Sequence, residues 1–226
     1  HWVPRRPPPD AMELARAVTL LREAQSPLIV AGGGAIYSEA PLADFAAAHG
    51  IPVVETQAGK GALPHDHPCN LGAIGVTGTE AANQAAAEAD AILAIGTRLQ
   101  DFTTGSRALF TGRIIGLNVQ PFDAGKLDAV PLVADAQAGL EALDAALAGH
   151  VAPAAWTDRA TAARDADKFS GMGGPREEPV WQGAIAAGIR LVMTENDLSL
   201  LIRGARDRAA FFDHCAALEP TKTAPR

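Results

Sequence analysis

The sequence predicts an α/β fold, with a doubly wound and mostly parallel sheet of five or six strands of the Rossmann-like kind. Two observations lead to this prediction. Short apolar runs alternate with helical segments along residues 11–148, an order typical of the βαβ units that build parallel sheets. Some of these runs end at glycine, as strands do where a tight turn leads into a helix.

The chain opens with HWVPRRPPPD, which predicts an extended linker because consecutive prolines fix φ and remove amide donors. A chain that begins inside such a linker is expected to be a piece of a longer polypeptide. Asp10 then begins a helix, and Glu13 follows three residues later, as in a capping box. The helical spacing of apolar residues over Leu14–Leu21 indicates one buried face.

The first strand is predicted at Leu28–Val30, a continuous apolar run typical of a strand covered on both faces. Three glycines at 32–34 end it. Ser38 is placed to cap a following helix, and Gly50 suits the turn that ends this helix. A second strand is predicted at Ile51–Glu55.

The same alternation returns farther along the chain. The predicted elements are a helix at 80–88, strands at Ala91–Ile95, Ile114–Val119 and Val130–Val133, and a helix from Asp135 to about Leu147. Asp135 is expected to cap the last of these helices.

The alternation stops after Gly149. Residues 157–168 predict a charged helix, and SGMGGPREEP at 170–179 predicts a flexible connection. A helix, a strand at Ile189–Met193 and a helix at Leu198–Phe212 follow. The expected organisation is a linker at 1–10, one domain at 11–168, a second linker at 169–179 and a short α/β tail at 180–226.

Composition narrows the classes of function. The formal net charge of -7 argues against nucleic acid and anionic membranes as partners. No segment approaches the roughly 18 apolar residues of a membrane span, and the first residues lack the apolar run of a signal peptide. Cys69 and Cys215 form no CxxC pair, which indicates free thiols in a reducing compartment. The cytoplasm is the expected location.

The glycines at 32–34 allow two interpretations. Glycines between a strand and a helix let a ligand phosphate approach backbone amides, but they also permit a tight turn that only packs helix on strand. The dinucleotide fingerprint needs a further glycine where this chain has Tyr37. The residues alone favour neither interpretation.

The glycine-rich segment 55–79 lacks periodicity, and long loops of this kind are often functional. Lys60 lies between two glycines and is placed to meet an anion, without the spacing of a P-loop. His65 and His67 flank Asp66, yet a zinc site needs three or four ligands. Structural roles for these histidines are therefore favoured over a metal site.

The segment GTRLQDFTTG at 96–105 follows a strand end, where open α/β sheets bind ligands. Arg98 and Asp101 are expected to bind either a ligand or each other. Glu195 and Asp197 allow a divalent metal, but a solvated turn is favoured. The sequence contains no GxSxG, no HExxH and no convincing Cys–His pairing, so it predicts a ligand-capable domain without visible catalytic machinery.

Three segments, AGGGAIYSEA at 31–40, ETQAGKG at 55–61 and RLQDFTTGS at 98–106, resemble the central domain of thiamine-diphosphate enzymes. The resemblance covers about residues 1–165. Among these enzymes it points to the hydrolases that open a cyclic 1,2-diketone, trihydroxycyclohexanedione, in myo-inositol breakdown.

The resemblance implies an intact chain with three α/β domains. The first supplies a glutamate that activates the cofactor, and the last holds Mg²⁺ and the diphosphate through a GDG-type motif, which this sequence lacks. The resemblance therefore implies a central structural domain that does not hold thiamine diphosphate or Mg²⁺ and is inactive alone. Its partners would be the missing N- and C-terminal domains, in a homo-oligomer when intact.

The resemblance also implies site residues, none of them catalytic or metal-binding. The cofactor-facing set is Gly32, Gly33, Gly34, Gly96, Thr97, Arg98, Asn118 and Gln120, and the substrate-entrance loop carries Gln57, Lys60 and His65. Flavin-binding relatives carry acidic residues where this chain has Asn118 and Gln120. Since a carboxylate accepts from ribose hydroxyls more strongly than an amide does, this departure argues against FAD.

Two other functions remain open. The chain could be a free-standing module of the same fold that binds FAD, NAD or an adenylate. It could also be a piece of a carbon–carbon lyase, because residues 186–212 resemble the last strand and helix of 2-keto-3-deoxy acid aldolase barrels. A lone strand–helix unit cannot close a barrel. Flanking reading frames for thiamine-binding domains would favour the central-domain interpretation.

Overall fold

The computed structural model describes residues 5–170, without the side chains of the last four. The predicted strand and helices of residues 180–218 lie outside the described residues, as do Glu195, Asp197 and Cys215. The predicted extended linker is described from Arg5 onward, and Pro7 and Arg6 contact Asp135 through a backbone hydrogen bond of 2.9 Å and an ion pair of 2.8 Å.

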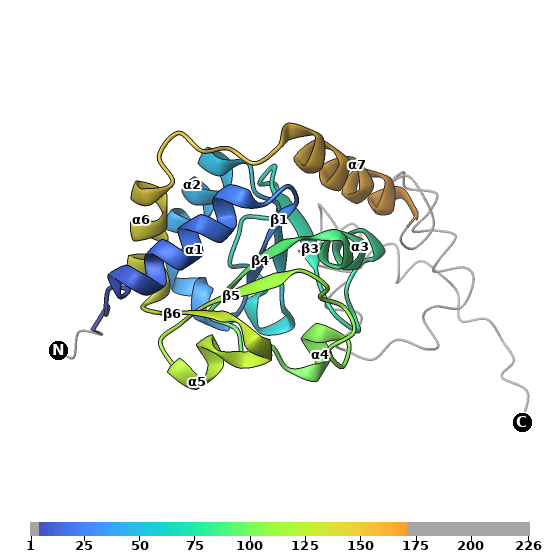
Figure 1. Ribbon diagram of the computed structural model, residues 1–226. Helices are drawn as coiled ribbons and strands as arrows, with labels where there is room; N and C mark the ends of the chain where they lie inside the picture. The colour runs from blue at the N-terminus through green and yellow to red at the C-terminus, as the bar shows by residue number, and fades with distance from the viewer. Residues whose placement is uncertain (1–4, 171–226) are drawn as a thin grey trace, which may run out of the picture. The chain divides into compact units, whose positions relative to one another are not determined.

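The described residues contain one sheet in which every neighbouring pair of strands is parallel (Figure 1). In spatial order the strands are β3 (Asn70–Ala73), β2 (Val53–Glu55), β1 (Pro27–Ala31), β4 (Ala91–Ile95), β5 (Arg113–Asn118) and β6 (Val130–Val133). The chain winds outward from β1 in one direction and from β4 in the other. This order confirms the predicted doubly wound, Rossmann-like sheet.

The helices follow the strands along the chain. They are α1 (Ala11–Glu23), α2 (Glu39–His49), α3 (Glu80–Glu88), α4 (Asp101–Thr104), α5 (Pro121–Ala124), α6 (Ala136–Ala146) and α7 (Ala154–Ser170), with 3₁₀ turns η1 (Gly33–Ser38), η2 (Gln57–Gly59) and η3 (Lys126–Asp128). The short α4 and α5 were not predicted, because four residues are too few for a periodic apolar pattern.

The apolar run of β1 divides between two cores because successive side chains of a strand point to opposite faces. Ile29 and Ala31 pack with buried side chains of α1, α2 and α6. Leu28 and Val30 pack with α3 and with the start of α7. The sheet is therefore covered on both faces, as the continuous apolar run predicted.

The two aspartates predicted as helix caps are confirmed. Asp10 accepts from two amides of the first turn of α1, and Asp135 accepts from two amides of α6. The predicted capping box forms only in part: Asp10 accepts from the Glu13 amide at 3.2 Å, but the Glu13 carboxylate binds a different amide. Its Oε2 accepts from the amide of Val133 at 2.8 Å and so joins α1 to β6. Gly50 ends α2 with φ +61°, as predicted.

Three boundaries differ from the predictions. Ser38 makes no side-chain cap, since η1 leads directly into α2. The second strand begins at Val53 instead of Ile51, because the Ile51 amide donates to the carbonyl of Ala46 at the end of α2. The segment 55–79 is not all loop: its residues Asn70–Ala73 form the edge strand β3 with an irregular register against β2.

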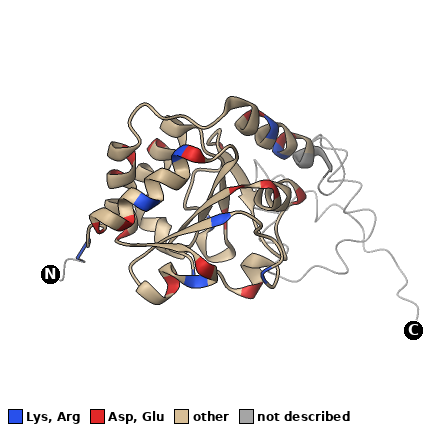
Figure 2. Ribbon diagram, in the orientation of Figure 1, with Lys and Arg blue, Asp and Glu red and all other residues tan. Residues whose placement is uncertain are grey.

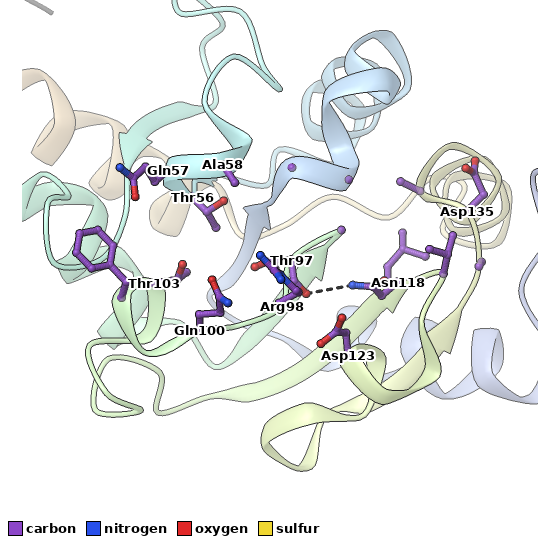
Figure 3. A pocket seen from close by; sticks show the side chains of 18 residues that line it. Thr56, Gln57, Ala58, Thr97, Arg98, Gln100, Thr103, Asn118, Asp123 and Asp135 are labelled. Carbon is purple, nitrogen blue, oxygen red and sulfur yellow. Dashed lines mark hydrogen bonds between the residues drawn. The ribbon is translucent and has the colours of Figure 1, made fainter. Parts of the chain in front are cut away.

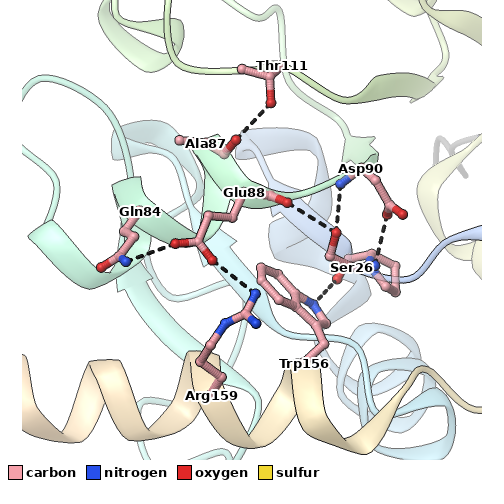
Figure 4. Close-up of polar contacts among 9 residues, drawn as sticks. Ser26, Gln84, Ala87, Glu88, Asp90, Thr111, Trp156 and Arg159 are labelled. Carbon is pink, nitrogen blue, oxygen red and sulfur yellow. Dashed lines mark hydrogen bonds and ion pairs between the residues drawn. The ribbon is translucent and has the colours of Figure 1, made fainter.

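Helix α7 is longer than the predicted 157–168, and it packs onto the domain. The buried indole of Trp156 donates from Nε1 to the carbonyl of Pro27 at 2.8 Å. Arg159 lies over the Trp156 ring at 5.1 Å and pairs with Glu88 of α3 at 3.0 Å (Figure 4). These contacts place α7 beside the start of β1 and the end of α3.

The charged residues do not gather by sign. Figure 2 shows Lys or Arg and Asp or Glu on the same helices, including α1 and α7. Within residues 5–170, no helix has both the length and the hydrophobicity needed to cross a bilayer.

Candidate functional site

A cavity of about 400 Å³ opens at the carboxyl ends of β1, β4 and β5 (Figure 3). It lies at the point where the strand order reverses, which is where open α/β sheets bind ligands. The turns after these strands line it, together with the start of η2 and of α6. The lining side chains with polar groups are Thr56, Gln57, Thr97, Arg98, Gln100, Thr103, Asn118, Asp123 and Asp135.

The glycine turn after β1 packs directly on the turn after β4. The amide of Gly32 donates to Ile95 O at 2.8 Å, and the amide of Gly34 donates to Gly96 O at 2.9 Å. A Cβ on Gly32 would lie 2.5 Å from Gly96 O, and one on Gly34 would lie 2.8 Å from Gly96 Cα. This geometry supports the tight-turn interpretation of these glycines.

The turns after β4 and β5 are joined by one amide side chain. Asn118 donates from Nδ2 to Thr97 O at 3.1 Å, and its Oδ1 accepts from the amide of Gln120 at 3.0 Å. The hydroxyl of Thr97 accepts from the amide of Leu99 at 3.2 Å. Asn118 therefore holds two turns in place with both of its polar groups.

The charged groups of the cavity are mostly paired. Asp123 pairs with Lys126 at 3.0 Å, and Asp135 pairs with Arg6 at 2.8 Å. Arg98 pairs with no carboxylate among residues 5–170, so the predicted alternative of an Arg98–Asp101 pair is not found there. The Arg98 guanidinium is the uncompensated charge of the lining.

A buried carboxylate shapes the loop after β2. Glu55 is 2% exposed, and its Oε1 accepts from the amides of Gly61 and Leu63 at 2.9 and 3.1 Å. Thr56 closes the η2 turn by accepting from Gly59. These bonds hold the loop in a shape that presents Gln57 to the cavity.

The structure brings together most of the predicted site residues. Gly33, Gly34, Gly96, Thr97, Arg98, Asn118 and Gln57 line the cavity. Gly32 is buried beneath the turn after β4, and the exposed side chains of Gln120, Lys60 and His65 lie outside the lining.

Sequence reasoning did not single out Gln100, Thr103, Asp123 or the cavity position of Asp135. Gln100 and Thr103 lie in the segment 96–105 after β4, and that position was a usable signal, because residues after parallel strands meet at one edge. Asp123 and Asp135 also follow strand ends, those of β5 and β6, so the same signal applied to them.

The histidines of the 55–79 segment have no metal-ligand geometry. His67 Nδ1 accepts from the amide of Cys69 at 3.2 Å, a structural contact. Burial raises the pKa of the Cys69 thiol, and the nearby Arg164 charge opposes this shift in part. Within the described part of the chain, no three His, Cys, Asp or Glu residues are grouped to hold a metal.

Comparison with known proteins identifies relatives. The family "Thiamine pyrophosphate enzyme, central domain" matches residues 14–143. Three similar proteins carry the name 3D-(3,5/4)-trihydroxycyclohexane-1,2-dione hydrolase. The Geobacillus thermodenitrificans protein is 52% identical over 155 residues, which are 67% of this chain and 24% of the relative.

The Halalkalibacterium halodurans protein is 45% identical over 66% of this chain and 24% of the relative. The Clostridium perfringens protein is 42% identical over 69% of this chain and 25% of the relative. The matched part of the chain spans about a quarter of the length of these relatives.

Proposed function

Because the chain belongs to the thiamine pyrophosphate enzyme central-domain family, we propose that it is the central domain of a hydrolase that opens trihydroxycyclohexane-1,2-dione. The observation that carries the proposal is the likeness of about two thirds of the chain to hydrolases named for this substrate. Flanking domains would hold thiamine diphosphate and Mg²⁺, and the intact enzyme would be a cytoplasmic homo-oligomer.

The proposed reaction adds one water molecule across the carbon–carbon bond that breaks. The bond between the two carbonyl carbons breaks, one of these carbons gains the hydroxyl of water and becomes a carboxylic acid, and the other gains hydrogen and becomes an aldehyde. Thiamine diphosphate supplies carbanion stabilisation when bound. This domain would supply architecture, with residues 11–168 as the folded unit between linkers and the η2 loop as one wall of the substrate entrance.

A free-standing nucleotide-binding module is the second candidate, because the cavity lies at the switch point of the sheet. Two features of the geometry weigh against it. The amides of Gly32 and Gly34 already donate within the protein. Asn118 uses both polar groups to join the turns.

A domain exchange tests the proposed function. The segment of the Geobacillus thermodenitrificans hydrolase that matches this chain is replaced by the corresponding residues of this chain. We expect the chimera to open the dione at a rate within about tenfold of the parent, a difference of about 1.4 kcal/mol in barrier. Rates are followed by release of the acid product.

The matched control is the same hydrolase with its own segment deleted, which should be inactive. A chimera that folds and binds thiamine diphosphate with Mg²⁺ but does not open the dione would contradict the proposed substrate. Such a result would assign the domain to another reaction of the same family.

A further inference from the structure

The charge pattern of the cavity points to the kind of ligand that it accepts. Asp123 and Asp135 are each neutralised by a basic side chain, at 3.0 and 2.8 Å. The Arg98 guanidinium has no carboxylate partner among the described residues. The lining thus carries one uncompensated positive charge, and a planar guanidinium with several donors suits a carboxylate or phosphate.

Neutral polar groups surround this charge. Figure 3 shows Gln100 and Thr103 on the same side of the cavity as Arg98, with Thr56 and Gln57 across from them. Within residues 5–170, the side chains of Gln57, Gln100 and Thr103 make no hydrogen bond to protein. Two amides and a hydroxyl therefore remain to donate to and accept from hydroxyl groups of a ligand.

Most amides of the glycine turn are used within the protein, which disfavours a diphosphate. A diphosphate cradle uses free amides of the glycine turn. Here the amides of Gly32, Gly34 and Ala35 donate to carbonyls of the protein at 2.8, 2.9 and 3.0 Å. A single guanidinium matches the single charge of a carboxylate.

From these observations we propose that the cavity binds a small polyhydroxylated carboxylate, with Arg98 on the carboxylate and Gln57, Gln100 and Thr103 on the hydroxyls. This is the chemical class of the ring-opened product, so the inference rests on the proposed function in naming that class. It adds a product-binding site on the central domain.

Calorimetric titration of the 226-residue chain tests the site with four probes. They are glucuronate as the hydroxylated acid, myo-inositol as the neutral polyol, acetate as the plain carboxylate and AMP as the phosphate. We expect glucuronate to bind at least about tenfold more tightly than myo-inositol or acetate, because only glucuronate engages both the guanidinium and the amides. AMP should bind more weakly than glucuronate.

Substitutions locate the binding. Arg98→Gln should weaken glucuronate binding at least about tenfold, because the charged hydrogen bonds are lost. The matched control is Arg113→Gln, which removes an exposed arginine from the other end of β5 and should leave glucuronate binding unchanged. Circular dichroism confirms that both variants are folded. Gln100→Ala should reduce the preference for glucuronate over acetate.

Several results would contradict the proposed binding site. These are no heat with glucuronate, equal binding of glucuronate and myo-inositol, an effect of Arg113→Gln equal to that of Arg98→Gln, or tighter binding of AMP than of glucuronate. The domain-exchange assay is independent of these titrations. If the chimera is active but the chain does not bind glucuronate, this inference is wrong and the proposed function is unaffected.

Discussion

Glycines at the switch point show how single residues decide the shape of the cavity. The turns after β1 and β4 approach so closely that a side chain at Gly32, Gly34 or Gly96 would overlap backbone atoms of the opposite turn. Gly96 also has φ +57°, a conformation that favours glycine. The two turns therefore form one rigid floor for the cavity.

Gly32→Ala should destabilise the fold. Its Cβ would lie 2.5 Å from Gly96 O, and overpacking of this kind lowers the free energy of unfolding by about 1–3 kcal/mol. Urea denaturation measures the change. The matched control is Gly125→Ala, where the nearest atom is Pro121 O at 3.6 Å and φ is -93°. Equal stability of the two variants would refute close contact between the turns.

The Cys69 thiol gives the chain a defined response to alkaline pH. Burial raises its pKa above that of a free thiol, so the unfolded chain loses the thiol proton before the folded chain does. The contribution to stability is therefore complete below about pH 9 and is lost as pH rises through the folded-state pKa. Denaturation between pH 8 and pH 11 should show a steeper loss of stability for the native chain than for Cys69→Ala. Parallel slopes would contradict the burial of this thiol.

At the scale of elements, α7 is the helix whose contacts the sequence did not predict. Its charged sequence predicts a helix but not the residues against which that helix packs. In the structure Trp156 donates to Pro27, and the hydroxyl of Thr157 donates to Gly50 O at 2.6 Å. Arg164 donates to the carbonyls of Pro68 and Asn70 at 2.8 and 3.1 Å. These contacts make α7 part of the folded unit.

Two substitutions at Trp156 separate the hydrogen bond from the packing. Trp156→Phe keeps an aromatic ring but leaves Pro27 O without its donor, and should lower the free energy of unfolding by about 1–3 kcal/mol. Trp156→Ala should lower it by about 3–5 kcal/mol because a cavity also forms. Thermal and urea denaturation measure both.

Arg159→Gln serves as the control for this helix. It breaks a pair whose side chains are 63% and 38% exposed, so its effect should be about 1 kcal/mol or less. If Trp156→Ala were as mild as Arg159→Gln, α7 would not be anchored through the indole.

At the scale of the whole molecule, the described domain provides a cavity but does not show the anchors of thiamine diphosphate. The one carboxylate buried near the cavity loop, Glu55, is occupied by the amides of Gly61 and Leu63. The metal needs oxygens from carboxylates or amides grouped around it, together with the diphosphate. The matched length, about a quarter of the relatives, leaves room for other domains to provide them.

The 226-residue chain alone should therefore neither bind thiamine diphosphate usefully nor open the dione. Calorimetric titration with thiamine diphosphate and Mg²⁺ should give no binding at micromolar concentration, and a turnover assay should give no acid. The active chimera is the positive control for both measurements. Micromolar binding or turnover by this chain would overturn its interpretation as a non-catalytic central domain.

The sequence by itself determined the local features of this protein. The strand–glycine–helix alternation predicted the parallel sheet, Asp10 and Asp135 predicted two helix starts, and Gly50 predicted a helix end. Each of these depends on residues a few positions apart, which pattern and propensity can describe. The same segments placed most of the cavity residues, because turns after parallel strands converge at one edge.

Only the tertiary structure decided the features that depend on distant partners. The edge strand β3 has a weak apolar pattern and exists through its pairing with β2. Glu13 meets Val133, and Trp156 meets Pro27, 129 positions away. The pairing of Asp135 with Arg6, which leaves Arg98 as the uncompensated charge, likewise joins residues far apart. No local pattern encodes such contacts, since they form only when the sheet brings those residues together.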